Sequence, residues 1–260
     1  MPRLYIPHTH IVEGQIRITG DKARYLISVL RCRKGDELIV FDGEGNCFRT
    51  MILKADRKGV ITEAIEQFSS NTESPLHITL VQGLLKGEKM DMVVQKTTEL
   101  GIKEIIPLIA ERSQLKETKK VDRWRKIAAE AAKQCGRTII PVIHEPVDFD
   151  HFFAGQGYSR GNSKTVEQRH DKMNGFIFWE EGGLSFKEAV LKISSSPNHR
   201  LNQLPIYLVI GPEGGFTKEE VIHAEEKGLL VASLGKRILR AETAAISTVT
   251  LVQFLLGDMG

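Results

Sequence analysis

Residues 206–217 read Ile206-Tyr-Leu-Val-Ile-Gly-Pro-Glu-Gly-Gly-Phe-Thr217, an apolar run that stops at a loop rich in glycine. The run is short and bounded by turn residues, which predicts a buried β-strand. The glycines after it carry no side chain and let a second molecule approach the main chain closely. Thr217-Lys-Glu-Glu220 has the spacing of a capping box, so a helix should follow. The stretch therefore predicts a strand, a glycine loop and a helix, the repeating unit of an α/β domain.

Residues 229–245 repeat this pattern nearer the C-terminus. An apolar run over residues 229–234 is interrupted by Gly235, and a charged cluster then precedes a long helix. Two strand ends with two glycine loops predict one crevice for a ligand. Pro212 and Glu213 put a rigid residue and an acid where a pyrophosphate needs free amides, so a neutral or cationic ligand suits the first loop better. Gly83 and Gly87 lack the spacing of a P-loop, and no dinucleotide motif is present.

Strand and helix patterns alternate from residue 76 to the C-terminus. Strands are predicted over residues 76–85, 102–109, 176–179, 206–210 and 229–234, and helices over residues 90–100, after Asp122, after Ser185 and after Thr217. Ser185-Phe-Lys-Glu188 matches a second capping box. Such alternation favours a mainly parallel sheet that is covered on both faces.

Residues 4–68 instead show short alternating runs separated by turns, typical of a small β-barrel or sandwich, and the loop Asp42-Gly-Glu-Gly-Asn46 is predicted to join two of the runs as a hairpin. One helix, for which Asp21 is the predicted N-cap, interrupts them. The polar segment 69–75 reads as a linker, so domains are expected at 1–70 and 75–260. Residues 155–175 are polar and nearly free of apolar side chains, which predicts an exposed loop.

Composition narrows the class of protein. The 36 Lys and Arg residues against 33 Asp and Glu give a net charge of +3, too small to indicate nucleic acid, although the first sixty residues are biased toward basic side chains. Three separated cysteines fit a reducing cytoplasm better than a disulfide framework. No apolar stretch approaches the roughly 20 residues of a membrane span. His8, His10 and His144 lack metal-ligand spacing, so neither a metal nor a membrane is expected.

Three segments together resemble the RsmE family, bacterial methyltransferases of the SPOUT superfamily that act on uridine N3 of small-subunit (16S) ribosomal RNA. They are Lys86-Gly-Glu-Lys-Met-Asp-Met-Val-Val-Gln-Lys-Thr-Thr-Glu-Leu-Gly101, Gly211-Pro-Glu-Gly-Gly215 and Leu234-Gly-Lys-Arg-Ile-Leu-Arg-Ala-Glu-Thr-Ala244. Glu111-Arg-Ser113 and Gln134-Cys-Gly-Arg137 extend the match over essentially the whole chain. The segment 155–175 is atypical of the family.

The resemblance implies a PUA-like RNA-binding β-barrel at 1–70 and a SPOUT trefoil-knot methyltransferase domain at 75–260, an exception to ordinary topology. It also implies a homodimer and S-adenosylmethionine bound in a bent form against the knot loops. The expected cofactor-binding residues are Trp179, Glu180, Gly211, Pro212, Glu213, Gly214, Gly215, Ser233, Leu234, Gly235, Ile238, Leu239, Arg240, Thr243 and Ala244.

Methyl transfer to N3 requires loss of a weakly acidic proton, so a general base or a cation that stabilises the uracil anion would assist. Arg240 is the candidate for the electrostatic role, and Glu242 for orienting Arg240 or accepting the proton. Each has an alternative. Arg240 also fits a structural ion pair, and Glu242 fits the first turn of a helix, where the helix dipole favours a carboxylate.

Candidate phosphate contacts occur in both domains, although each alone also fits a solvated charge. They are Lys22, Arg24, Arg31, Arg33, Lys86, Lys89, Arg112 and Arg137. Two other functions remain open: a tRNA-directed SPOUT methyltransferase, and a ribosome assembly factor that binds RNA without catalysis.

Overall fold

The computed structural model describes residues 1–7, 11–12, 14–155, 173–194 and 204–260. Within these ranges the chain forms two compact units, Met1–Glu73 with Ala129–Ile140, and Ser74–Ala128 with Pro141–Gly260. The expected boundary near residues 70–75 did not anticipate that Ala129–Ile140 returns to the N-terminal unit. Most of the predicted polar loop, residues 156–172, lies outside the described residues.

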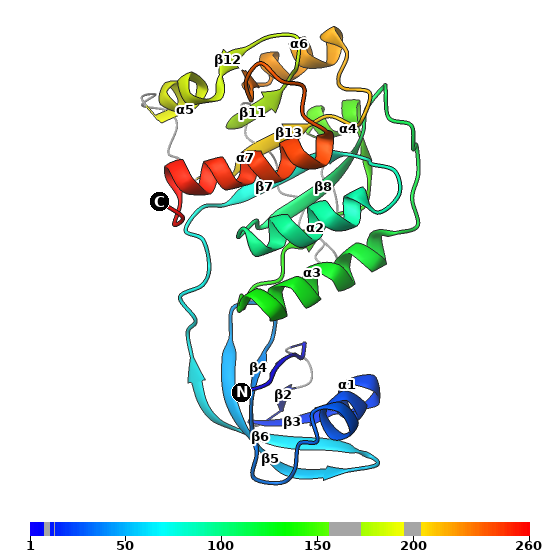
Figure 1. Ribbon diagram of the computed structural model, residues 1–260, viewed down its shortest axis with the longest axis vertical. Helices are drawn as coiled ribbons and strands as arrows, with labels where there is room; N and C mark the ends of the chain where they lie inside the picture. The colour runs from blue at the N-terminus through cyan, green and yellow to red at the C-terminus, as the bar shows by residue number, and fades with distance from the viewer. Residues whose placement is uncertain (8–10, 13, 156–172, 195–203) are drawn as a thin grey trace. The chain divides into compact units, whose positions relative to one another are not determined.

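The N-terminal unit contains a six-stranded sheet with the order β1-β4-β5-β6-β3-β2. Its strands are β1 (Arg3–Tyr5), β2 (Ile11–Val12), β3 (Gln15–Ile18), β4 (Glu37–Phe41), β5 (Cys47–Asp56) and β6 (Gly59–Phe68) (Figure 1). The predicted loop between β4 and β5 is built on Asp42, whose Oδ1 accepts from the N–H groups of Glu44 at 2.8 Å and Asn46 at 3.0 Å. Alternate residues of the strands bury a core that includes Ile16, Ile18, Leu38 and Val40.

The predicted N-terminal helix is present but begins earlier than expected. Helix α1 (Gly20–Arg24) continues into a π-helical turn, Tyr25–Val29. Thr19 is the N-cap residue, so the assignment of Asp21 to that position is wrong. Asp21 lies in the first turn and pairs with Arg24 at 3.3 Å on the surface, where such a pair stabilises little.

The second unit is built on an eight-stranded sheet whose pairings are all parallel in the described residues. The order is β10-β8-β7-β13-β11-β14-β12, and β9 pairs with β8. The strands are β7 (Ile78–Gly83), β8 (Glu104–Ile109), β9 (Val142–Ile143), β10 (Val147–Asp148), β11 (Gly175–Phe178), β12 (Leu184–Ser185), β13 (Ile206–Ile210) and β14 (Leu230–Ser233).

Helices cover both faces of this sheet. Every residue of β7 and β11 is buried as a result. Figure 1 shows α2 (Lys89–Glu99) beside α7 (Ala241–Leu256), and α7 also packs on β7 and β13. Helices α4 (Phe149–Phe153) and α6 (Lys218–Glu226) share a second apolar cluster with Val81, Ile177 and Val209. The remaining helices are α3 (Val121–Cys135) and α5 (Phe186–Ser194). No helix in the described ranges has the length and apolar character needed to cross a membrane.

Local signals fixed several helix starts. The predicted capping box at Thr217 and Glu220 is present at the start of α6. Ser185 and Glu188 form the second predicted box, with the Ser185 N–H donating to Glu188 Oε2 at 3.0 Å.

Long-range hydrogen bonds tie helix α7 to the start of the second unit. Gln253 of α7 is fully buried, donates to the carbonyl of Leu100 at 2.7 Å and accepts from Ser74 Oγ at 2.9 Å.

Candidate active site

Three adjacent parallel strands end at the same edge of the larger sheet. β11 pairs with β13 on one side and with β14 on the other. In an open parallel sheet, ligands bind beyond the carboxyl ends of the strands. The segments that follow β11, β13 and β14 therefore meet where a ligand site is expected, and two of them are the glycine loops of the sequence.

The loop after β13 is held tightly against β7. A Cβ atom on Gly83 would overlap the backbone nitrogen of Pro212, so the two main chains pass in direct contact. The buried Gln82 side chain donates from Nε2 to the carbonyl of Gly211 at 3.3 Å and to that of Gly83 at 3.0 Å. The Gly215 N–H then closes a turn onto Pro212 O at 3.0 Å. These contacts fix the first loop before any ligand binds.

The segment after β14 leads into helix α7. Gly235 has φ +106° with no neighbour near its missing Cβ, a conformation that suits glycine. Arg240 is the N-cap of α7 with φ −63° and ψ 148°, and its carbonyl accepts the N–H of Ala244 at 2.8 Å. Residues 234–240 thus form an irregular connection, bent at Lys236 and Arg237, between a strand end and a helix start.

These segments enclose a pocket of about 560 Å³. Most of the predicted cofactor residues line it, and two do not, Gly214 and Thr243. Lys89 and Glu242, predicted in other roles, also line it. The sequence interpretation missed Phe178, Ile210, Ala232, Lys236, Arg237 and Ala241. Phe178 and Ile210 are the last residues of their strands, so extending the predicted crevice to each strand end would have found them.

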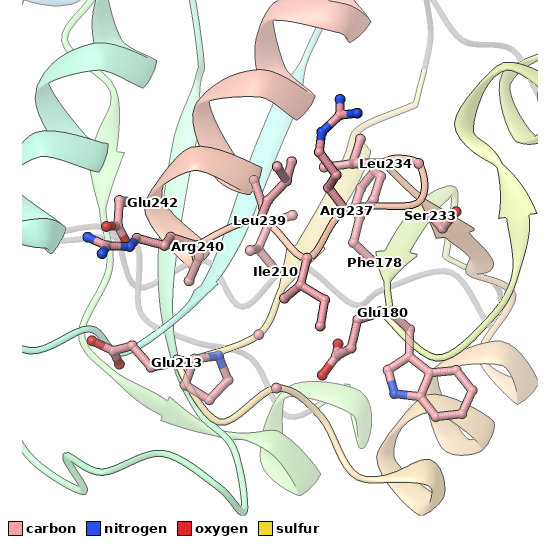
Figure 2. A pocket seen from close by; sticks show the side chains of 18 of the residues that line it. Phe178, Glu180, Ile210, Glu213, Ser233, Leu234, Arg237, Leu239, Arg240 and Glu242 are labelled. Atoms are coloured by element: carbon pink, nitrogen blue, oxygen red, sulfur yellow. The ribbon is translucent and has the colours of Figure 1, made fainter.

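The pocket has an apolar part and a charged part. Figure 2 shows Phe178 and Leu234 on one side, with the charged Arg237 and Glu180 near them, while Glu213, Arg240 and Glu242 gather on the other. Phe178 and Ile210 are buried, and Leu239 is half-buried. A flat heterocycle suits the apolar side. Charged ligand groups suit the other, where carboxylates and cations alternate.

Glu213 is the most strongly held carboxylate of the pocket. Its Oε1 accepts from Lys89 Nζ at 2.9 Å and from the Lys86 N–H at 3.2 Å. Burial alone would raise the pKa of Glu213, but these hydrogen bonds outweigh burial and hold the pKa below its ordinary value. Glu213 is therefore ionised throughout the neutral pH range.

Three buried polar atoms of the pocket residues have no hydrogen-bond partner in the described structure: Trp179 Nε1, Glu213 Oε2 and Glu242 Oε2. Unpaired buried polar atoms are uncommon and often mark where a ligand binds. One donor and two carboxylate oxygens beside apolar walls fit heterocyclic ligands that carry their own hydrogen-bonding groups, among them S-adenosylmethionine. Among the described residues, no group of three His, Cys, Asp or Glu side chains is placed to hold a metal.

Within the second unit, the basic residues predicted to contact RNA differ in exposure and in the contacts that their side chains already make. Lys86 is exposed, and Lys89 lines the pocket in its ion pair with Glu213. Arg112 is exposed, but its Nη1 donates to the carbonyl of Phe216 at 3.3 Å. Lys86 therefore offers its charge to solvent, whereas Lys89 and Arg112 also hold the glycine loop.

In the N-terminal unit, Arg24, Arg31 and Arg33 are exposed, and Lys22 Nζ donates to Tyr5 O at 2.7 Å. Arg137 requires a correction, because its side chain is only 2% exposed and its Nη2 donates to Glu73 at 2.8 Å. A side chain so buried has no surface for a phosphate. Arg137 is structural.

Comparison with known proteins agrees with this geometry. Residues 72–253 match the RNA methyltransferase domain family, and residues 18–65 match the RNA methyltransferase PUA domain family. Ribosomal RNA small subunit methyltransferase E of a Synechocystis species is 35% identical over 253 residues, covering 96% of this chain and 76% of that protein. The protein of the same name from Buchnera aphidicola of Acyrthosiphon pisum is 31% identical, with 99% and 95% covered.

Solved structures show the same fold. Ribosomal RNA small subunit methyltransferase E from Neisseria gonorrhoeae, bound to S-adenosylmethionine, superposes with a TM-score of 0.82 at 29% identity, and both chains are fully covered. A putative methyltransferase from Legionella pneumophila with bound cofactor gives 0.80 at 32%, covering 99% and 98%. The fold and the pocket thus define an RNA methyltransferase with a PUA-like N-terminal domain. The chain belongs to the ribosomal RNA small subunit methyltransferase E family, the RsmE family of the SPOUT superfamily.

Proposed function

We propose that this protein transfers a methyl group from S-adenosylmethionine to N3 of a uridine in 16S ribosomal RNA. The observation that carries the proposal is the glycine-walled pocket at three parallel strand ends, with one apolar side and one charged side. When bound, the cofactor supplies an electrophilic methyl group. The apolar side chains Phe178 and Leu234 would hold its adenine. The loops of Gly211–Gly215 and residues 233–240 are the proposed cofactor-binding segments.

Arg240 and Glu242 are the proposed electrostatic pair of the reaction. Both line the pocket, and Figure 2 shows them on the same side of it as Glu213. An arginine there stabilises negative charge on the uracil oxygens as N3 loses its proton. Glu242 would orient that arginine once the substrate binds, since the two side chains form no ion pair in the described structure. Exposed cations of each unit would bind RNA phosphates: Lys86 in the second unit, and Arg24, Arg31 and Arg33 in the N-terminal unit.

A homodimer is part of the proposal. Leu251, Phe254 and Leu255 of α7 are 38%, 57% and 44% exposed, an apolar surface that a second copy would cover.

A trefoil knot in the second unit is also part of the proposal. The chain runs from β13 past β11 to β14, and α7 then returns to pack on β13 and β7. We place the protein in the bacterial cytoplasm, where ribosomal subunits mature.

The test incubates purified protein with S-adenosylmethionine labelled in the methyl group and with small ribosomal subunits, naked 16S RNA or tRNA. Digestion to nucleosides should give labelled 3-methyluridine from the small-subunit substrates and none from tRNA. Calorimetry with the cofactor runs in parallel. Folded protein that binds the cofactor yet labels only tRNA, or no RNA at all, would overturn the proposed substrate. Absence of cofactor binding would indicate a non-catalytic RNA-binding factor.

A further inference from the structure

The Lys89–Glu213 ion pair presents a donor and an acceptor side by side in the pocket. Lys89 Nζ lies 2.9 Å from Glu213 Oε1, and both residues line the cavity. Oε1 has two donors, Lys89 Nζ and the Lys86 N–H at 3.2 Å. Oε2 is buried and has no partner in the described structure. Glu213 is therefore held by one oxygen and has the other available to a ligand.

This pair is complementary to one edge of uracil. The imide edge of uracil carries a carbonyl oxygen, an acceptor, next to the N3–H donor. An ammonium can donate to the carbonyl while the neighbouring carboxylate oxygen accepts from N3–H. Cytosine has no proton on N3 and would turn a lone pair toward the carboxylate. A buried acceptor facing another acceptor is unfavourable, so the pair discriminates between the two bases.

We infer that Lys89 and Glu213 together recognise the uracil imide and that Glu213 Oε2 accepts the N3 proton, an inference that rests on the proposed function. The N3–H bond breaks and its proton passes to Oε2. The electron pair left on N3 forms the bond to the methyl carbon, and the sulfur of the methyl donor keeps the pair of the bond that breaks. Lys89 stabilises the charge that grows on the uracil oxygen.

The other acids of the pocket fit this role less well. Glu180 is exposed, so water competes for its oxygens. Glu242 also has a buried unpaired oxygen, but no cation is paired with its carboxylate in the described structure, so it offers no donor beside the acceptor. Of these three acids, Glu213 alone combines a buried unpaired oxygen with an ion pair in the part of the chain that the structure describes. The lowered pKa of Glu213 keeps its carboxylate unprotonated and able to accept a proton. It also makes Glu213 a weak base, so the proton moves as the methyl group transfers.

The experiment first maps the uridine that the wild-type protein methylates. Failure at that stage contradicts the proposed function and is separate from the inference. Glu213→Gln is then compared with Glu219→Gln, a matched change at an exposed acid of α6. Glu213→Gln should lower kcat by about 100-fold or more, as expected for loss of a general base, while the cofactor Kd stays within about threefold of wild type. Glu219→Gln should match wild type in both.

The pH profile separates a proton acceptor from a structural role. In Glu213→Gln, kcat should climb about tenfold per pH unit as the uracil itself ionises, whereas wild type stays flat over the same neutral range. Lys89→Met removes the hydrogen bond that lowers the pKa of Glu213. In Lys89→Met, the fall of kcat on the acid side of the pH profile should therefore occur at higher pH than in wild type. A flat profile for Glu213→Gln, turnover close to wild type, or a loss confined to cofactor Kd would each overturn the inference.

A binding measurement needs no turnover. Small-subunit RNA with uridine or cytidine at the mapped position is titrated with protein saturated with demethylated cofactor. Wild type should prefer uridine by about tenfold, and Glu213→Gln should lose that preference because an amide can donate to cytosine N3. Equal preference in the two proteins would show that Glu213 does not contact the imide.

Discussion

The backbone N–H of Glu111 donates to Oε1 of Glu220 at 2.8 Å, across 109 positions of the chain. The other oxygen of Glu220 accepts the N–H of Thr217 at 2.9 Å and so completes the capping box of α6. One buried carboxylate therefore fixes both the loop after β8 and the start of the helix that follows the Gly211–Gly215 loop. Arg112, next to Glu111, adds its own bond to Phe216 O. The glycine loop is anchored at its far end by these contacts.

Glu220→Gln should destabilise the protein although it preserves size and shape. An amide offers only one oxygen, so one of the two backbone N–H groups would face a nitrogen that also carries hydrogens. A buried donor left unpaired costs about 1–3 kcal/mol in the free energy of unfolding. Chemical denaturation of the variant and of the exposed Glu219→Gln control measures this. A Glu220→Gln midpoint equal to that of the control would contradict the role assigned to this carboxylate.

Arg137→Met should destabilise the N-terminal unit through its partner. Glu73 accepts from Arg137 and also from the N–H groups of Thr138 at 2.9 Å and Ile139 at 3.0 Å. Removing the arginine leaves a largely buried carboxylate without its cation, which costs about 3 kcal/mol in unfolding free energy. The surface pair of Arg24 supplies the control, since Arg24→Met should change stability by less than about 1 kcal/mol. Equal unfolding curves for the two variants would refute the structural assignment of Arg137.

Much of the fold follows from local sequence signals. The alternation of strands and helices after residue 76, the two capping boxes and the loop at Asp42 were all predicted, because each depends on neighbouring residues. The prediction at Asp21 failed by two positions, since Thr19 also fits an N-cap and only the backbone conformation distinguishes them. Element ends are where such predictions are weakest.

Contacts between distant residues explain what the sequence did not predict. In the sequence Arg137 resembles a surface cation. Its partner Glu73 lies 64 positions away, so no neighbouring residue indicates that the two are paired. Gly214 lies in the middle of a motif, yet its missing Cβ makes room for Arg112 rather than for a ligand. The pairing of Lys89 with Glu213 spans 124 positions. The motif located the pocket, and tertiary packing alone decides which of its residues face the cavity.

Gly214→Ala and Gly215→Ala should therefore differ. At Gly214 the new Cβ would meet Arg112 Cβ and O at 2.9 Å, away from the cavity, so stability falls more than cofactor affinity. At Gly215 the Cβ would overlap the Glu180 carboxylate, and φ +70° adds strain of about 1–2 kcal/mol. Displacing Glu180 disturbs the pocket itself, so cofactor affinity should fall about tenfold or more. Calorimetry and denaturation of both variants check this, and the reverse ranking would exclude it.

Arg240→Ala tests whether this arginine acts in the transition state. Arg240 is the N-cap of α7 and makes no side-chain cap bond. A cation at a helix N-terminus is unfavourable by about 0.3–1 kcal/mol, so stability alone does not explain an arginine here. The alanine variant should keep its unfolding free energy or gain slightly, and cofactor Kd should stay within about threefold. Its kcat should fall about 100-fold, the scale of losing one donor to a developing anion.

Arg240→Lys should recover part of that turnover, because it restores the charge without the planar guanidinium. Steady-state kinetics with the mapped RNA substrate, beside cofactor calorimetry, separate the two effects. A fall in cofactor affinity that accounts for the whole loss would assign Arg240 to binding. Loss of stability in Arg240→Ala would instead show that the arginine holds the helix start through a structural contact.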